Sequence, residues 1–305
     1  MPKVTPSMPG RIRIGTCSWT DPSLIRAGTF YPTGAQTAEA QLNYYASQFD
    51  IVEVDSSYYA MPSRRNATLW AERTPGDFIF DVKAFRLFTG HPTQPQSLPA
   101  DIRGALPGSL AQKKNLYYRD VPAELQQHLW SRFEDALLPL DSAGKLGVVL
   151  LQFPPWFHPG VAQMDHILAC REHLARHTVA VEFRNNRWLS EQNRGATLSF
   201  LRQHQLPFVC VDEPQGFASS VPPIAEVTAD TAIVRFHGRK SEAWETKNAS
   251  PGDRFDYYYD EEELAPWVDR IRGCAAVASE VHVLFNTNNG DQGVANARLM
   301  GRLLD

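Results

Sequence analysis

The 305-residue sequence has few cysteines and no long hydrophobic run. No stretch approaches the roughly 18 apolar residues of a membrane-spanning helix, and residues 1–10 contain three prolines but no apolar signal segment. The four cysteines, Cys17, Cys170, Cys210 and Cys274, lie far apart without a C-x-x-C pair, which predicts buried, reduced thiols. These absences predict a cytoplasmic protein with no membrane partner, in which residues 1–10 form a flexible lead.

A strong excess of either charge is also absent. The formal net charge is -4, so the composition gives no bulk electrostatic reason to bind nucleic acid. Hydrophobic residues make up 43% and charged residues 21% of the chain, which is ordinary for a folded globular protein. The composition therefore excludes a largely disordered chain and weakens the case for nucleic acid as the partner.

Nucleotide-binding glycine motifs are missing as well. The segment that follows the first apolar run reads GTCSWTDP (15–22) rather than G-x-G-x-x-G, and no P-loop pattern occurs in the sequence. This disfavours an open, doubly wound sheet of the dinucleotide-binding kind.

What the sequence does contain is a regular alternation of short apolar runs with segments of helical spacing. The runs that we interpret as strands are 11–18, 51–57, 77–84, 146–153, 178–184, 207–213, 231–238 and 280–287. The segments that we interpret as helices are 35–48, 64–73, 122–140, 161–175, 194–205, 260–273 and 292–304. Eight strands with mostly helical connections predict an α/β fold, a single (β/α)8 barrel of the TIM type over residues 11–305.

Three connections of this predicted barrel differ from the rest. The connection between the sixth and seventh strands, 214–230, has no convincing helix. The connections 85–121, after the third strand, and 239–259, after the seventh, are too long for ordinary βα loops. Because both follow strands, we expect both at the C-terminal mouth, where TIM-type barrels hold their active sites.

Polar residues share one parity near the end of every predicted strand. In strand order they are Thr16 and Ser18; Glu53, Asp55 and Ser57; Lys83; Gln152; Glu182 and Arg184; Asp212; Arg235 and His237; and Asn286. Alternate side chains of a barrel strand face the axis, and the earlier residues of the same parity are mostly apolar or small. The pattern predicts a ring of polar side chains at the mouth, where a substrate would bind.

The residue types in this ring favour acid/base chemistry on a small anionic substrate, phosphorylated or sugar-like. Glu182 is the first candidate for the general acid or base, because burial and crowding are expected to bring its pKa toward neutrality; Asp212 is the second. His237 is a candidate proton carrier. The predicted substrate contacts are Lys83, Arg184, Arg235, Gln152, Asn286, Glu53, Asp55, Trp19 and Tyr58.

Other interpretations of the same ring stay open. Glu182, Asp212, His237 and Asn286 are oxygen-rich ligands that suit magnesium or manganese, but the neighbouring cations repel a metal, so no metal is assigned and the cofactor is unknown. The ring could instead be a structural lattice of ion pairs, although buried pairs are weak stabilisers.

Two further alternatives concern the partner. Arg86, Lys113, Lys114, Arg119 and Arg239 on the long loops could hold nucleic acid, with aromatic side chains stacking on bases. A ligand sensor would bind the same small molecule without changing it. We favour the enzyme over both.

Several short motifs occur in an order that resembles a known family. They are GTCSW (15–19), VEVDSSYY (52–59), VKAFR (82–86), QFPPWF (152–157), VEFRNNRW (181–188), VRFHGR (234–239) and LFNTNNG (284–290). Together they are similar to the YecE-like family, catalogued as domain of unknown function 72, from about residue 11 to residue 304. The resemblance implies a TIM-type barrel and supplies no reaction, since the family is named for lacking one.

Overall fold

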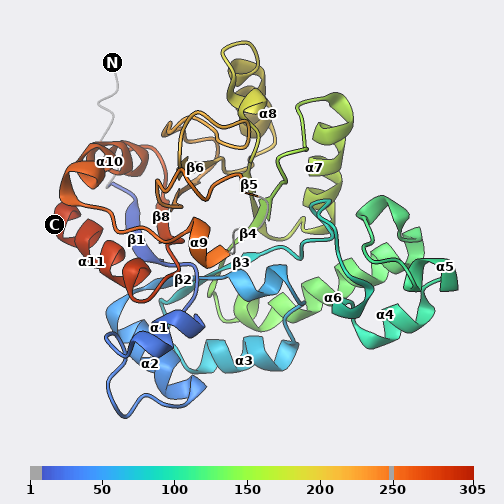
Figure 1. The fold of residues 1–305 in the computed structure, drawn as a ribbon, viewed down its shortest axis with the longest axis horizontal. Helices are drawn as coiled ribbons and strands as arrows, with labels where there is room; N and C mark the ends of the chain where they lie inside the picture. The colour runs from blue at the N-terminus through green and yellow to red at the C-terminus, as the bar shows by residue number, and fades with distance from the viewer. Residues whose placement is uncertain (1–8, 247–250) are drawn as a thin grey trace, which may run out of the picture.

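The computed structural model describes residues 9–246 and 251–305 (Figure 1). The strands within these residues are β1 (Arg11–Thr16), β2 (Ile51–Val54), β3 (Ile79–Lys83), β4 (Leu146–Gln152), β5 (Thr178–Glu182), β6 (Val209–Asp212), β7 (Thr231–Phe236) and β8 (Glu280–Phe285). They form one parallel sheet in the order β5-β4-β3-β2-β1-β8-β7-β6. A parallel bridge between Val181 and Phe208 brings its two ends together. The predicted (β/α)8 barrel of the TIM type is confirmed.

The predicted helices all occur, with small changes at their ends. They are α2 (Ala38–Gln48), α3 (Arg64–Glu72), α6 (Ala123–Ser142), α7 (Val161–His173), α8 (Arg194–Gln203), α10 (Glu261–Ala275) and α11 (Gln292–Leu304). Short elements that the sequence did not indicate are α1 (Pro22–Ala27), α4 (Ala100–Ala105), α5 (Gly108–Ala111), α9 (Pro251–Arg254), η1 (Asp55–Tyr58), η2 (Pro95–Ser97), η3 (Tyr118–Asp120) and η4 (Asn186–Leu189). Residues 214–230 contain no helix, as expected.

Two expectations fall partly on residues that the structure does not describe. Most of the expected flexible lead (1–10) lies in residues 1–8, and part of the long connection 239–259 lies in residues 247–250. Both segments are outside the described residues.

Side-chain caps explain where several helices begin. The hydroxyl of Ser63 accepts a hydrogen bond of 3.1 Å from the N–H of Asn66, which starts α3 after the η1 turn. Asp260 and Glu263 cap the start of α10 reciprocally, each carboxylate accepting from the other residue's N–H. Such caps satisfy N–H groups that have no partner inside the helix. They fix the points at which the chain leaves the barrel mouth.

The long connection after β3 is a folded insertion rather than a loose loop. Its helices α4 and α5 lie outside α6, at the right of Figure 1. Phe88 stacks on Trp130 of α6, with the ring centres 3.6 Å apart. The connection 85–121 therefore packs along α6, and its early residues, including His91, stay near the strand ends.

Below the strand ends, the barrel interior holds a buried acid–histidine pair. Nδ1 of His282 lies 2.8 Å from Oδ2 of Asp81, and the N–H of Val148 donates to Oδ1 of Asp81 at 2.9 Å. The pairing of β3 with β4 shifts register here, and a Cβ on Gly147 would lie 2.2 Å from Oδ1 of Asp81. Glycine at position 147 is thus what allows the carboxylate to fit.

The first strand presents its residues one position out of step with the expected parity. The hydroxyl of Thr16 lies 2.9 Å from the hydroxyl of Tyr45, so Thr16 faces α2 rather than the barrel axis. Cys17 faces the interior instead, where its sulfur lies 3.5 Å from Nη2 of Arg235. Placing Thr16 in the polar ring was therefore wrong.

The same correction applies to the sixth strand. Asp212 accepts a hydrogen bond of 2.8 Å from Nε1 of Trp267 in α10, so its carboxylate points away from the barrel axis. Glu213 takes the interior position. The run 207–213 is apolar on both parities up to residue 211, so it offers no contrast between a helix-facing and an axis-facing side. The prediction that Asp212 faces the axis was wrong for this reason.

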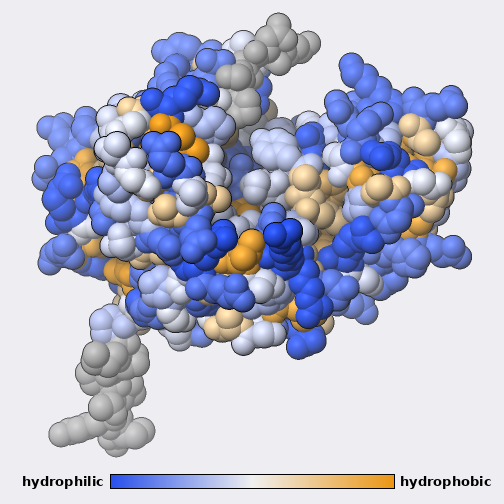
Figure 2. All heavy atoms as spheres, turned by 90° about the horizontal axis from the view of Figure 1, so that it is seen from below, coloured by the Kyte–Doolittle hydropathy of each residue, from blue (hydrophilic) through white to orange (hydrophobic). Residues whose placement is uncertain are grey.

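Hydrophobic residues are scattered over the face of the molecule in Figure 2. Within residues 9–246 and 251–305, no helix has the length and apolar character needed to cross a membrane. The face in Figure 2 is mostly hydrophilic, and its hydrophobic residues form small, separate spots. Such scattered apolar residues are normal for a protein surface.

Candidate functional site

Glu182, at the end of β5, is the centre of the polar ring. Its Oε1 accepts hydrogen bonds of 2.7 Å from Nε2 of Gln152 and from Nε of Arg184. Its Oε2 forms an ion pair with Arg235, whose Nη2 also donates to Oε1 of Glu53 at 2.6 Å. Both carboxylates and the Arg235 guanidinium are fully buried. Four strands thus meet in one set of charge-assisted hydrogen bonds.

His237, directly after β7, also contacts this set of hydrogen-bonded side chains. Its Nε2 lies 2.9 Å from Nη2 of Arg184 and 3.2 Å from Oε1 of Glu182, and its Nδ1 lies 3.1 Å from Nδ2 of Asn286. Burial and then the neighbouring Arg184 guanidinium hold the pKa of His237 well below its usual range. The imidazole is therefore neutral at physiological pH, with Nε2 accepting from Arg184.

Lys83 and Asp55 form a second pair on the β2–β3 side. Nζ of Lys83 lies 2.8 Å from Oδ1 of Asp55 and 4.5 Å from the centre of the Tyr58 ring. Burial opposes the charge on Lys83, but the attraction of Asp55 and Glu53 outweighs it and raises the Lys83 pKa. The ammonium group is therefore charged and lies over the face of the Tyr58 ring.

The structure brings most of the predicted site residues together and leaves two apart. Those that meet at the mouth are Glu53, Asp55, Tyr58, Lys83, Gln152, Glu182, Arg184, Arg235, His237 and Asn286. Trp19 instead packs edge-on against the stacked rings of Trp70 and Phe80, with ring centres 5.5 and 6.2 Å away. Asp212 accepts hydrogen bonds from Nε and Nη2 of Arg239 and from the Tyr259 hydroxyl, next to α10.

The carboxylates of the ring differ in pKa, and the pKa of Glu182 does not shift in the expected direction. Burial opposes ionisation of Glu182, but the charges of Arg235 and Arg184 together outweigh burial and lower its pKa well below the usual range. The expected shift toward neutrality was therefore wrong. Burial does raise the pKa of Glu53, to about 7, with Arg235 opposing the shift.

Glu213 is the carboxylate that the parity of the sequence missed. Its Oε1 accepts from the N–H of Val221 at 2.7 Å, and its Oε2 accepts from Nη1 of Arg184 at 2.8 Å. Burial raises its pKa to about 8, although Arg184 opposes the shift. A second acidic residue directly after Asp212 was the one available signal. The interior carboxylate of β6 is thus mostly protonated at neutral pH.

A cavity of about 590 Å³ lies over this ring. Its floor includes Gln152 and Arg184, and its walls include Tyr58, His91, Trp156, Ser219, Trp244 and Arg254. Trp156, in the connection after β4, is 55% exposed. Small-molecule sites in proteins typically have volumes of about 300–1,000 Å³ and aromatic walls with a few polar groups. The mouth has the size and lining of such a site.

Two cations, Lys83 and Arg86, lie next to the Tyr58 and His91 wall of the cavity. Burial, and then the charges of Lys83 and Arg86, lower the pKa of His91 to about 3. The guanidinium of Arg86 stacks on Tyr58 at 5.2 Å and forms no ion pair within the described residues. Nδ1 of His91 lies 2.9 Å from the hydroxyl of Thr89. The wall therefore combines a neutral imidazole with an unpaired cation.

The possible metal ligands are not gathered around one point. Asp212 faces α10, whereas Glu182 and His237 are both in contact with guanidinium nitrogens. In the described part of the chain, no group of three or more His, Cys, Asp or Glu side chains is arranged to hold a metal ion. The donor set at the mouth fits anions better than cations.

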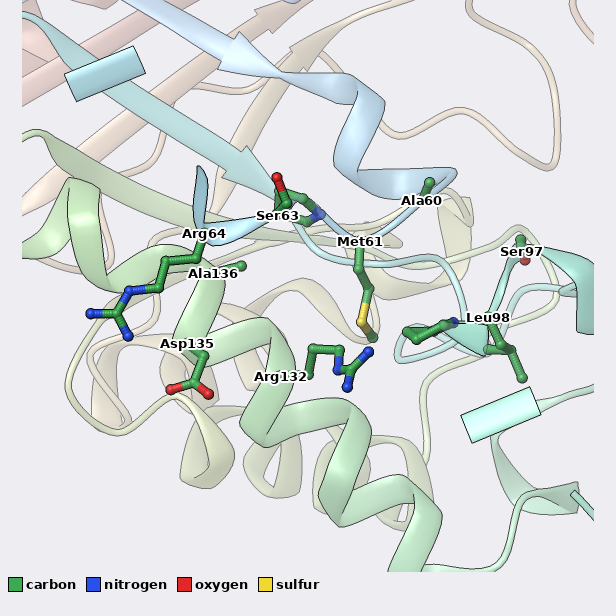
Figure 3. Close-up of a pocket in the computed structure, with 11 residues that line it drawn as sticks. Ala60, Met61, Ser63, Arg64, Ser97, Leu98, Arg132, Asp135 and Ala136 are labelled. Atoms are coloured by element: carbon green, nitrogen blue, oxygen red, sulfur yellow. The ribbon is translucent and has the colours of Figure 1, made fainter. Parts of the chain in front are cut away.

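A second cavity, of about 460 Å³, lies between the segments 60–64 and 97–99 and helix α6 (Figure 3). In Figure 3, Met61 points between Leu98 and Arg132. The Arg132 guanidinium is already held in an ion pair with α4. None of the polar residues predicted from the strand ends line this cavity, so we place the candidate site at the barrel mouth.

Comparisons with known proteins give a consistent family relationship. The model of the family described as "Protein of unknown function DUF72" matches residues 13–305. The UPF0759 protein YunF of Bacillus subtilis is 31% identical over 298 residues, covering 96% of this chain and 95% of that protein.

Solved structures give the same relationship. A DUF72 family protein from Enterococcus faecalis has a TM-score of 0.78 and 26% identity, over 96% of this chain and 95% of that one. One from Thermotoga maritima has a TM-score of 0.73 and 28% identity, over 96% of this chain and 98% of that one.

Proposed function

This chain belongs to the DUF72 family of proteins of unknown function, and we propose that its barrel mouth is the active site of an enzyme that acts on a small anionic molecule with a sugar-like or other ring. The observation that carries the proposal is the cavity of about 590 Å³ with aromatic walls and a guanidinium in its floor. Aromatic side chains pack on sugar or flat rings, and a guanidinium binds phosphate or carboxylate.

Arg184 is the proposed anion contact in the cavity floor. Its guanidinium donates to Glu182, Glu213 and His237. A guanidinium has five N–H groups, so two are left for a ligand. The side chain is held rigidly and 12% exposed, which favours binding without reorganisation of the site.

The proposed proton-holding group is Glu213, which is fully buried and bonded to Arg184 of the cavity floor rather than part of the cavity lining. With a pKa of about 8, it holds a proton at neutral pH and releases it within reach of the physiological range. Glu53, with a pKa of about 7, is the second candidate. Glu182 is assigned a different role, that of the fixed negative charge that orients Arg184 and Arg235.

A non-catalytic ligand-binding protein is the second candidate, and one observation favours it. The charged groups of the floor, Arg184, Arg235 and Glu182, already have partners of opposite charge, as a structural lattice of ion pairs would. Nucleic acid is a weaker candidate, because Lys113 and Arg239 of the proposed basic surface are themselves paired with carboxylates.

A cytoplasmic location belongs to the same proposal. It is supported by the four cysteines, which are buried free thiols. Thiols persist in this form in a reducing compartment.

Binding is tested by thermal unfolding with four probes: glucose 6-phosphate, glucose, phenyl phosphate and phenol. A ligand present at about 100 times its Kd stabilises the folded state by about 2.7 kcal/mol. At least one phosphorylated probe should raise the melting temperature by several degrees, and its uncharged parent should not. The same screen includes a single-stranded oligonucleotide, whose binding in place of the phosphorylated probes would contradict the proposal.

The variant Trp156→Ala locates the binding. Trp156 is exposed at the cavity, so its removal should weaken binding of the probe without unfolding the protein. Tyr117→Ala is the matched control, because Tyr117 is an exposed aromatic residue outside the cavity. Equal shifts in both variants would place the binding elsewhere.

Turnover is tested with the small-molecule fraction of a cell extract, analysed by mass spectrometry. The wild type should deplete an anionic metabolite that the folded double variant Glu182→Gln/Arg184→Met leaves unchanged. An anionic metabolite that is retained by the protein but never converted would identify a binding protein instead.

A further inference from the structure

Three polar atoms without hydrogen-bond partners lie on the two connections that follow β6 and β7. They are Oγ of Ser220, Nε1 of Trp244 and Nε of Arg254. Ser220 is 4% and Trp244 7% exposed, so water does not reach these atoms freely. A buried donor without a partner costs about 1–3 kcal/mol. Such atoms are rare in native proteins, and a bound ligand or water is the usual explanation.

The unpartnered indole lies beside the cation of the cavity floor. The guanidinium carbon of Arg184 is 5.3 Å from the centre of a Trp244 ring. Trp244 and Arg254 both line the cavity together with Arg184. Unused N–H groups of three side chains therefore gather at the β5–β7 end of the mouth.

The opposite end of the cavity has a different character. There the rings of Tyr58, His91 and Trp156 follow one another, with ring centres 5.2 Å apart for Tyr58 and His91 and 5.9 Å for His91 and Trp156. The cavity is thus divided into a donor-rich end and an aromatic end, and a ligand with a charged group and a ring has one preferred orientation.

We propose that the phosphate or carboxylate group of the ligand binds to Arg184 at the β5–β7 end, that the buried indole of Trp244 turns to donate its Nε1–H to the same group, and that the ring of the ligand rests against Trp156. This inference rests on the proposed function and adds the orientation of the substrate and a specificity-determining residue. Hydrogen bonds from a buried indole and a guanidinium to an anion are of the strong, charge-assisted kind.

A carboxylate on the same wall, that of Glu245, already has hydrogen-bond donors of its own, which offset part of its repulsion of an anion. Oε1 of Glu245 accepts hydrogen bonds from the N–H and the hydroxyl of Ser219, at 3.1 and 2.8 Å. Its charge is therefore directed at the connection after β6. The contact also ties the two connections to each other, which keeps Trp244 in place over Arg184.

The test compares two indole substitutions by titration calorimetry with phenyl phosphate, benzoate and inorganic phosphate. Trp244→Phe keeps a ring over Arg184 and removes the N–H. It should therefore raise the Kd for phenyl phosphate and for inorganic phosphate by about tenfold or more. Trp156→Phe, at the aromatic end, should leave inorganic phosphate binding unchanged. Whichever of phenyl phosphate and benzoate binds the wild type more tightly identifies the anionic group as phosphate or carboxylate.

A second measurement does not depend on the folding of the variants. The protein has seven tryptophans, each with one indole N–H signal in a proton–nitrogen correlation spectrum. Titration of the wild type with inorganic phosphate should move one of these signals strongly downfield, the one that Trp244→Phe lacks. If phenyl phosphate binds the wild type and Trp244→Phe equally and no indole signal moves, the inference is wrong while the proposed function stands. If none of the three probes binds the wild type, the inference is wrong, and the proposed function fails with it when glucose 6-phosphate also leaves the melting temperature unchanged.

Discussion

Replacement of Arg235 by methionine should destabilise the protein strongly, because its guanidinium compensates two carboxylates that have no access to water. Arg235, Glu53 and Glu182 are all fully buried, and Arg235 donates to both acids. Removal of one partner from such a set costs about 3–5 kcal/mol, since the charges that remain are left without compensation. Urea unfolding of the wild type and Arg235→Met measures the difference.

The pH dependence of this loss has a definite sign. Burial raises the pKa of Glu53 from 4.5 to about 7, and Arg235 is the main group that opposes the rise. An acid with a raised folded-state pKa loses stabilising free energy as the pH rises through that pKa. Without Arg235 the pKa of Glu53 rises further, so Arg235→Met should lose more stability at pH 8 than at pH 6.

Two further variants make the prediction specific. Arg132→Met breaks an exposed ion pair with Asp101 and should cost no more than about 1 kcal/mol. The double variant Arg235→Met/Glu53→Gln removes one of the two stranded charges and should recover part of the lost stability. A loss below about 1 kcal/mol in Arg235→Met, or no recovery in the double variant, would refute the assigned coupling of charges.

Two other predictions concern the interior of the barrel. Gly147→Ala places a Cβ 2.2 Å from the Asp81 carboxylate and should destabilise the protein by about 1–3 kcal/mol in the same unfolding assay; a neutral effect would contradict the close packing there. Glu213→Gln should flatten the dependence of stability on pH between about 4.5 and 8, because the raised pKa of Glu213 makes the wild type lose up to about 1.4 kcal/mol per pH unit in that interval. Parallel stability curves for wild type and Glu213→Gln would show that Glu213 titrates normally.

The sequence predicted the barrel well because the patterns that indicate strands and helices recur along the whole chain. Eight apolar runs and seven helical segments each occur where the sequence placed them. The short helices α4 and α5, which have six and four residues, were missed because they are too short to show helical periodicity. They lie in the connection 85–121, where prolines are frequent.

Site residues were predicted correctly on strands where a polar residue follows apolar residues of the same parity. They were missed on strands that are apolar on both parities. Glu182 and Arg235 stand out from apolar neighbours of the same parity, and the structure brings them into contact. The run before Asp212 is apolar on both sides, so Glu213 was missed. Trp244 is in a long connection without periodicity, so no sequence pattern could place it over the mouth.

The pKa of Glu182 shows a separate limit of sequence reasoning. Burial alone would raise that pKa, and burial is what an apolar strand predicts. The direction is reversed by the guanidinium groups of Arg235, which β7 supplies, and of Arg184, which follows Glu182 by two residues. The Arg235 partner reaches Glu182 only because the barrel closes, and the sequence of one strand does not show which residues of other strands will lie beside it.

The most direct test of the proposed site is a crystal structure of the protein soaked with phenyl phosphate. The account predicts density in the mouth cavity, with the phosphate against Arg184 and Trp244 and the ring against Trp156. Density in the cavity beside Met61 and α6, or an unchanged mouth at saturating probe, would contradict the claim that the barrel mouth binds small anions.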